Sequence, residues 1–155
     1  MSEYVIVKWL HILSSTVLFG TGIGSAFYML VASRHRDPRI AYFVVRWVVV
    51  ADWIFTTTAV IVQPLTGFYL VYLAGYPPTS RWIVWSTVLY LVAGACWLPV
   101  VWMQMQMREM ARAAVEAGTE LPPRYGRFFT IWVALGIPAF FALVVVFYLM
   151  VAKPT

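Results

Sequence analysis

The stretch that decides the fold is residues 4–31, which read YVIVKWLHILSSTVLFGTGIGSAFYMLV. A helix needs about 20 apolar residues to cross the hydrocarbon core of a membrane, and this run is longer than that. It contains one histidine, His11. Because residues three or four apart share a helical face, His11 lies on the same face as Ser15, Gly22 and Ser25. A histidine above small and polar residues is expected to face protein rather than lipid.

The composition indicates an integral membrane protein with a single all-α domain over residues 1–155. The chain is 63% hydrophobic and 11% charged, whereas soluble domains are roughly 25% charged. Four apolar runs are predicted to span the membrane as helices, at residues 4–31, 44–73, 82–107 and 128–151. The third is expected to continue as a helical extension that breaks at Gly118. Short connections then predict an up-down four-helix bundle of antiparallel neighbours.

Positive charge predicts the orientation, because cytoplasmic loops retain lysine and arginine during insertion. The first and third connections and the adjoining helix ends hold eight arginines: Arg34, Arg36, Arg39, Arg46, Arg108, Arg112, Arg124 and Arg127. The opposite side has only Lys8, Arg81 and Lys153. Both termini are therefore expected on the non-cytoplasmic side of a bacterial inner membrane. This distribution also explains the net charge of +5 without a nucleic-acid partner.

The second predicted span has a polar seam of its own. Its members recur at intervals of four, three, four and three residues: Asp52, Thr56, Ala59, Gln63 and Thr66. Unsatisfied polar groups in lipid cost several kcal/mol, so this face is expected to turn toward protein or a bound polar group. By helix depth, Thr66 and Ser86 fall near the level of His11, about 10 Å below the outer end. Asp52 falls near the cytoplasmic end, so it is expected to form a separate feature.

A histidine inside a membrane is either a hydrogen-bonded structural residue or a ligand, and we give these interpretations even weight. A metal site built by protein alone needs three or four ligands, which one buried histidine and the single cysteine, Cys96, do not supply. Haem needs only one axial ligand, because the porphyrin contributes four nitrogens. Of the common cofactors, haem is the one that His11 alone can hold.

Other candidates carry less weight. Met103, Met107 and Met110 share a face, and thioethers bind Cu(I), but methionines at this spacing more often serve packing. Gly20 and Gly24 form a GxxxG pair, which is typical of close contact between membrane helices. Asp52 is expected to have an interfacial partner such as an arginine, with proton relay as the alternative. The lone cysteine excludes an intrachain disulfide.

Three segments carry a family resemblance: Lys8–Leu13 (KWLHIL), Gln63–Gly67 (QPLTG) and Val151–Pro154 (VAKP). The whole chain resembles a bacterial family of four-helix membrane proteins known only as a domain of unknown function. More distantly, it is similar to HemJ protoporphyrinogen oxidases and to the membrane domain of CopD copper-resistance proteins. The HemJ resemblance implies a b-type haem ligated by His11. In HemJ proteins an important lysine of the third helix corresponds to Ser86 of this chain, and a later histidine corresponds to Cys96 or Trp97.

The sequence thus predicts a homo-oligomeric membrane protein that binds haem b through His11, in contact with lipid and with a quinone or porphyrin as partner. Lys8 and Arg81 would neutralise propionates, and Ser15, Gly22 and Gln63 would line the cavity. If the chain is an enzyme, it is expected to be a haem-dependent membrane oxidoreductase resembling HemJ. The alternatives are a copper-handling or small-solute transport protein resembling CopD, and an accessory subunit without chemistry.

Overall fold

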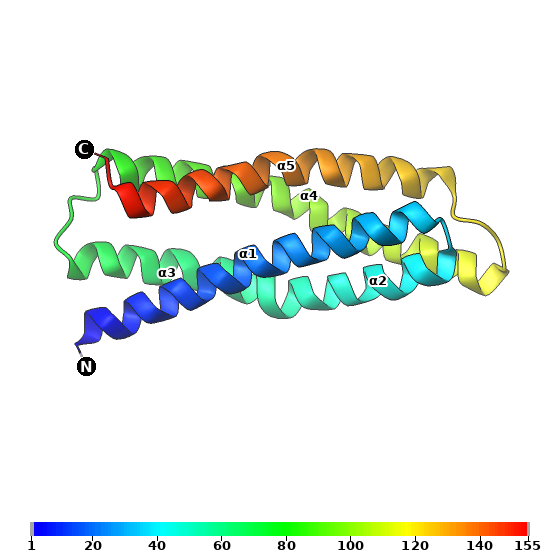
Figure 1. Cartoon of the computed structure of the whole chain (residues 1–155), viewed down its shortest axis with the longest axis horizontal. Coiled ribbons are helices and arrows are strands. Elements are labelled where there is room, and N and C mark those ends of the chain that lie inside the picture. Colours follow the sequence, from blue (N-terminus) through cyan, green and yellow to red (C-terminus); the bar gives the residue numbers. More distant parts are fainter. Residues whose placement is uncertain (1, 155) are drawn as a thin grey trace.

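The computed structural model describes residues 2–154 and shows an up-down bundle of long helices (Figure 1). The elements are α1 (Glu3–His35), α2 (Pro38–Ala51), the π-helical turn η1 (Asp52–Thr56), α3 (Thr57–Leu73), α4 (Arg81–Ala117) and α5 (Pro123–Ala152). Since α2, η1 and α3 form one continuous span, four helices are long and apolar enough to cross a membrane. The predicted all-α fold with four spans is therefore confirmed.

Each helix is longer than its apolar run. The second span begins at Pro38 instead of residue 44, because Asp37 caps it by accepting a hydrogen bond from the Arg39 backbone N–H at 2.8 Å. The first span, α1, continues past its apolar run to His35 and ends where Arg36 adopts the left-handed conformation. Gly118, with φ of +63°, ends α4 as expected. Hydropathy therefore predicts which residues span the membrane, whereas capping residues determine where each helix begins and ends.

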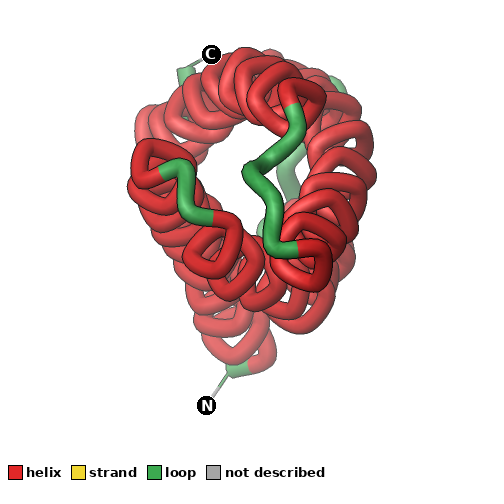
Figure 2. Tube along the Cα trace, turned by 90° about the vertical axis from the view of Figure 1, so that its right-hand side faces the viewer, coloured by secondary structure: helices red, strands yellow, loops and turns green. Residues whose placement is uncertain are grey.

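The two termini lie at the same end of the bundle, which we call the terminal end (Figure 1). Seen end-on, the spans surround a common axis (Figure 2). In this arrangement α4 packs against α5 and α2, and α1 packs against α3 and α2. Toward the terminal end α1 diverges from α5 (Figures 1 and 2). Contact between α1 and α5 includes Phe19, whose ring lies 5.3 Å from those of Phe140 and Phe147.

The apolar core lies in the half of the bundle away from the terminal end. It is built around buried side chains of α1, α2, α4 and α5, among them Met29, Val45, Met107, Tyr125 and Trp132. Large apolar side chains also cover the outer surface, such as Leu65 at 66% exposure and Leu98 at 66%. A water-soluble protein rarely shows an apolar surface of this extent, whereas lipid favours it.

Pro64 interrupts α3, and a side chain of α4 compensates for it. Proline has no backbone N–H, so the carbonyl of the residue four positions earlier, Val60, loses its helical donor. The Tyr90 hydroxyl donates to this carbonyl at 2.7 Å. The hydrogen bond that the proline removes within one span is therefore replaced by a bond between two spans, which joins α3 to α4.

We predict that Tyr90→Phe lowers the free energy of unfolding by about 1–3 kcal/mol, because it leaves the Val60 carbonyl without a donor. Reversible unfolding in mixed micelles measures this loss. In a Pro64→Ala background the new backbone N–H can bond to Val60, so the same substitution should cost less. Tyr72→Phe is the matched control, since Tyr72 is 78% exposed. Equal effects of the two tyrosine substitutions would contradict the assignment.

Candidate functional site: a polar seam between the spans

The polar residues of the second span face the interior, as their spacing predicts. Asp52, Thr56 and Ala59 are 4%, 5% and 3% exposed, and Gln63 and Thr66 are half-buried. The seam from Asp52 to Thr66 covers about 21 Å at 1.5 Å per residue, against roughly 30 Å for the hydrocarbon core. Polar groups are therefore present over most of the depth of the membrane, on a side that faces other helices.

The seam begins in the π-helical turn η1, which the sequence does not predict. The Thr57 backbone N–H bonds to the Asp52 carbonyl five residues earlier, and the Thr57 hydroxyl donates to the same oxygen at 2.9 Å. The Thr56 hydroxyl donates to Oδ1 of Asp52 at 2.7 Å. Turns of this kind are rare and are found frequently at functional sites. Two threonines thus hold Asp52 by its backbone and by its carboxyl group.

His11 joins α1 to α3 near the terminal end. Its Nδ1 lies 2.8 Å from the Thr66 hydroxyl oxygen, and that hydroxyl donates to the Val62 carbonyl at 2.7 Å. Assigning the threonine proton to this carbonyl makes Nδ1 the donor of the first bond, and in the neutral ring Nε2 then carries no proton. Within residues 2–154, no hydrogen bond to Nε2 is found.

Gly67 allows the close approach of α1 and α3 at His11. A Cβ atom at position 67 would lie 3.1 Å from Cε1 of the imidazole and within 4.0 Å of both ring nitrogens. Real Cβ contacts are rarely this short, so a larger residue would push the ring or the helix aside. The half-buried imidazole is therefore fixed on two sides, by the Thr66 hydroxyl and by the glycine backbone.

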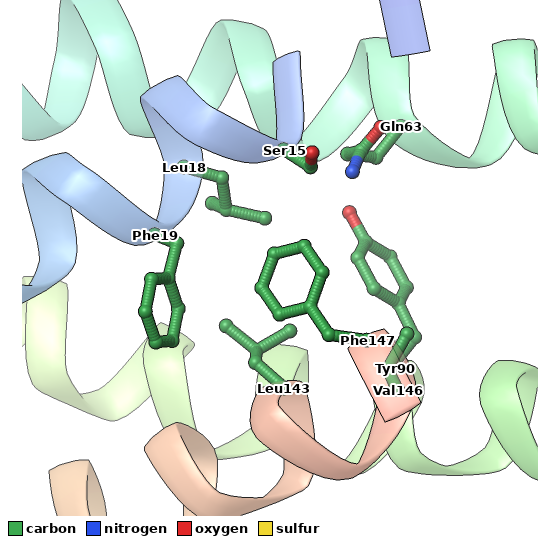
Figure 3. Close-up of a pocket in the computed structure, with 8 residues that line it drawn as sticks. All are labelled: Ser15, Leu18, Phe19, Gln63, Tyr90, Leu143, Val146 and Phe147. Atoms are coloured by element: carbon green, nitrogen blue, oxygen red, sulfur yellow. The ribbon is translucent and has the colours of Figure 1, made fainter. Parts of the chain in front are cut away.

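A small cavity lies between α1, α3, α4 and α5 (Figure 3). Its volume is about 30 Å³, more than the roughly 10–15 Å³ that a cavity needs to hold a water molecule. Ser15 of α1, Gln63 of α3 and Tyr90 of α4 supply its polar groups, and these converge in Figure 3. Apolar residues complete the lining: Leu18, Phe19, Leu143, Val146 and Phe147. Oε1 of Gln63 is buried and, within the described chain, has no hydrogen-bond partner.

The other residues predicted for a haem site do not gather around this cavity. Gly22 was expected to line it but is exposed, and no atom lies within 4 Å of a Cβ placed there. Ser86 is 3% exposed, and its hydroxyl has no partner among the described residues. Lys8 and Arg81 are exposed, with the Lys8 ammonium 5.8 Å from the Tyr4 ring. A shared helical face with His11 therefore predicted the inward position of Ser15 correctly but not that of Gly22.

The structure also shows what surrounds the other residues that the sequence suggested as functional candidates. Met103 and Met107 are buried in the apolar core, which favours packing as their role. Gly20 and Gly24 approach no other helix of this chain, since nothing lies within 4 Å of an added Cβ. The arginine expected beside Asp52 is not present: in the described chain, the ion pairs join Arg108 and Arg112 to glutamates of the same helix.

The interior cavity is too small for a haem. Ligand pockets usually measure roughly 300–1,000 Å³, about ten times the interior cavity or more. A more open groove of about 250 Å³ runs between α1 and the second span. Its lining comprises Ser14, Val17, Ile54, Phe55, Thr58, Ala59 and Val62, without His11. Within residues 2–154, no group of three or more His, Cys, Asp or Glu side chains is placed to hold a metal ion.

Sequence comparison identifies one family. The model of the family described as predicted integral membrane protein (DUF2269) matches residues 5–154. No curated protein and no solved structure gave a match. The similarity to HemJ and CopD proteins stays a prediction.

Proposed function

The chain belongs to the DUF2269 family of predicted integral membrane proteins, and we propose that its function is to transfer protons within the membrane. His11 and Asp52 are the groups that accept and release them. The observation that carries this proposal is the polar seam: Asp52 lies on it, His11 of α1 is hydrogen-bonded to its Thr66, and the cavity of Ser15, Gln63 and Tyr90 lies between them. Chains of aspartate, glutamate and histidine serve as proton relays in membrane pumps and transporters.

The size of the cavity favours protons over a larger solute. At about 30 Å³ it has room for one water molecule, and a water needs two to four polar partners. Ser15, Gln63 and Tyr90 provide these partners, and in Figure 3 the amide nitrogen of Gln63 is turned toward the Tyr90 hydroxyl. Proton transfer through hydrogen-bonded groups requires no wider passage. A metabolite or a quinone head group would not fit the same space.

The seam is closed between this cavity and Asp52. Ala59 is 3% exposed, and its carbonyl accepts a hydrogen bond from the Ser14 hydroxyl at 3.4 Å. A proton that moves from the cavity to Thr56 and Asp52 has to pass about 10 Å of this packing, which is two helical turns. The proposed transfer therefore includes a transient opening of α1 against α3 at Ala59, through which water enters.

We predict that protein in liposomes conducts protons when a potassium gradient and valinomycin set a membrane potential, with an enclosed pH-sensitive dye as the readout. Asp52→Asn removes the titratable group with little change in shape and should reduce the flux to that of protein-free vesicles. Glu120→Gln is the matched control, because Glu120 is exposed and lies outside the seam. Wild-type flux equal to that of empty vesicles, or undiminished flux in Asp52→Asn, would refute the proposal.

Haem binding through His11 is a second candidate, and one observation favours it. Histidines that bind metals donate their other ring N–H to a fixed acceptor, and Nδ1 of His11 does so to Thr66 while Nε2 has no described partner. Because the cavity of one chain does not enclose a macrocycle, a haem on Nε2 would lie outside the interior of the bundle.

Haem binding predicts a Soret band in the absorption spectrum of protein purified from cells with ample haem. His11→Ala should abolish this band, because no other histidine lies within a predicted span. His35→Ala should leave it unchanged, since His35 is exposed at the end of α1. A wild-type spectrum without a Soret band would remove this candidate.

A further inference from the structure

Two arginines in the half of the bundle away from the terminal end contact aromatic rings. The guanidinium carbon of Arg46, on α2, lies 5.2 Å from the centre of the Trp47 ring. That of Arg124, in the first turn of α5, lies 4.9 Å from the Phe128 ring, which in turn lies 5.6 Å from the ring of Trp102 on α4. Trp47 and Trp102 are 50% and 49% exposed, so both arginines lie beside aromatic side chains of the outer surface.

Neither of these arginines has an acidic partner among residues 2–154. The ion pairs found in this part of the chain join Arg108 and Arg112 to glutamates of α4. The first turn of α5 contains no acidic residue, although helices favour one there. An aromatic ring attracts a cation through its quadrupole but carries no net charge. The positive charges of Arg46 and Arg124 are therefore not neutralised by a contact within the described chain.

The two unpaired arginines lie where the apolar surface ends. The apolar run of α5 begins at residue 128, so Arg124 lies about 6 Å beyond it at 1.5 Å per residue. Arg46 lies just inside the run that begins at residue 44, and its long side chain can extend to the interface. The paired Arg112, by contrast, lies about 15 Å beyond Trp102 along α4. Unneutralised charge is thus placed at the membrane boundary.

Guanidinium groups in this position are suited to a phosphate. Five N–H donors in a planar fork match the oxygens of a phosphate group, two at a time. The arginine side-chain hydrogen bonds found within residues 2–154 come from Arg108 and Arg112, so the donors of Arg46 and Arg124 remain available. At the boundary of a membrane, the phosphates within reach belong to lipid headgroups, and an anionic headgroup is attracted most strongly. Contact with a ring also restricts each arginine before binding, which lowers the entropy lost on binding.

We propose that Arg46 with Trp47, and Arg124 with Phe128 and Trp102, form two binding sites for the headgroup of an anionic phospholipid. Each guanidinium donates to the phosphate oxygens, and the exposed indole rings contact the lipid at the level of the headgroup. Charge complementarity carries this assignment, because the chain has a net charge of +5 and the arginines at these sites have no acidic partner. Inorganic phosphate offers the same oxygens but has no apolar part to contact the rings.

Electron spin resonance of spin-labelled lipids in vesicles that contain the protein tests the proposal. The measurement compares how strongly the protein immobilises phosphatidylglycerol, which is anionic, and phosphatidylcholine, which is zwitterionic. The wild type should favour phosphatidylglycerol about two- to fivefold at low salt, and the preference should disappear in roughly 1 M salt. Combined Arg46→Gln and Arg124→Gln substitutions should remove most of the preference. Arg112→Gln is the matched control, because it removes the same charge from an exposed arginine that already has an acidic partner.

Equal immobilisation of the two lipids by the wild type would overturn the inference, whether or not the vesicles conduct protons. An effect of Arg112→Gln as large as that of the double variant would also overturn it, because the preference would then follow net charge and not these sites. Phe128→Leu keeps the charge and removes the ring, so it should lower the preference; an unchanged preference would overturn the site at Arg124. Inorganic phosphate at constant ionic strength should have no effect, and competition by phosphate would indicate a site for the free anion and overturn the lipid assignment.

Discussion

The structure depends on one constraint: inside a membrane, a polar side chain must find its partner within the protein. The threonine hydroxyls of the second span donate hydrogen bonds within that span, and further hydrogen bonds join the span to its neighbours. His11 of α1 binds Thr66, and the Ser14 hydroxyl binds the Ala59 carbonyl. From α4, the Tyr90 hydroxyl binds the Val60 carbonyl. These bonds fix the rotation of α3 and leave its apolar residues to the lipid.

The same constraint explains what the sequence could predict. The number of spans follows from apolar length, and the inward face of the second span follows from the spacing of Asp52, Thr56 and Gln63. Both are confirmed. The π-helical turn could not be predicted, because one extra residue in a helical turn leaves no pattern in composition. Nor could the spacing reveal that Tyr90 replaces the donor lost at Pro64, since that contact depends on how two helices pack. Gly22 shares a face with His11, but it is exposed.

A purely structural interpretation of the seam accounts for many of these observations but not for all of them. Hydrogen bonds that only join helices would be expected to leave no buried polar atom without a partner. In the described chain seven buried side-chain atoms have no hydrogen-bond partner, and Oε1 of Gln63, a residue that lines the cavity, is one of them. Scaffolding also gives no reason to keep a buried carboxyl group without a counter-charge. We therefore regard the seam as a path for protons as well as a means of assembly.

The central claim is that the polar seam is turned inward, with Thr66 hydrogen-bonded to His11 of α1. A double-mutant cycle of His11→Ala and Thr66→Val, measured by reversible unfolding in mixed micelles, tests it most directly. The account predicts a coupling of about 0.5–1.5 kcal/mol, the range found for hydrogen bonds between membrane helices. Additive effects of the two substitutions would show that the residues do not interact, and would contradict the inward rotation of the second span.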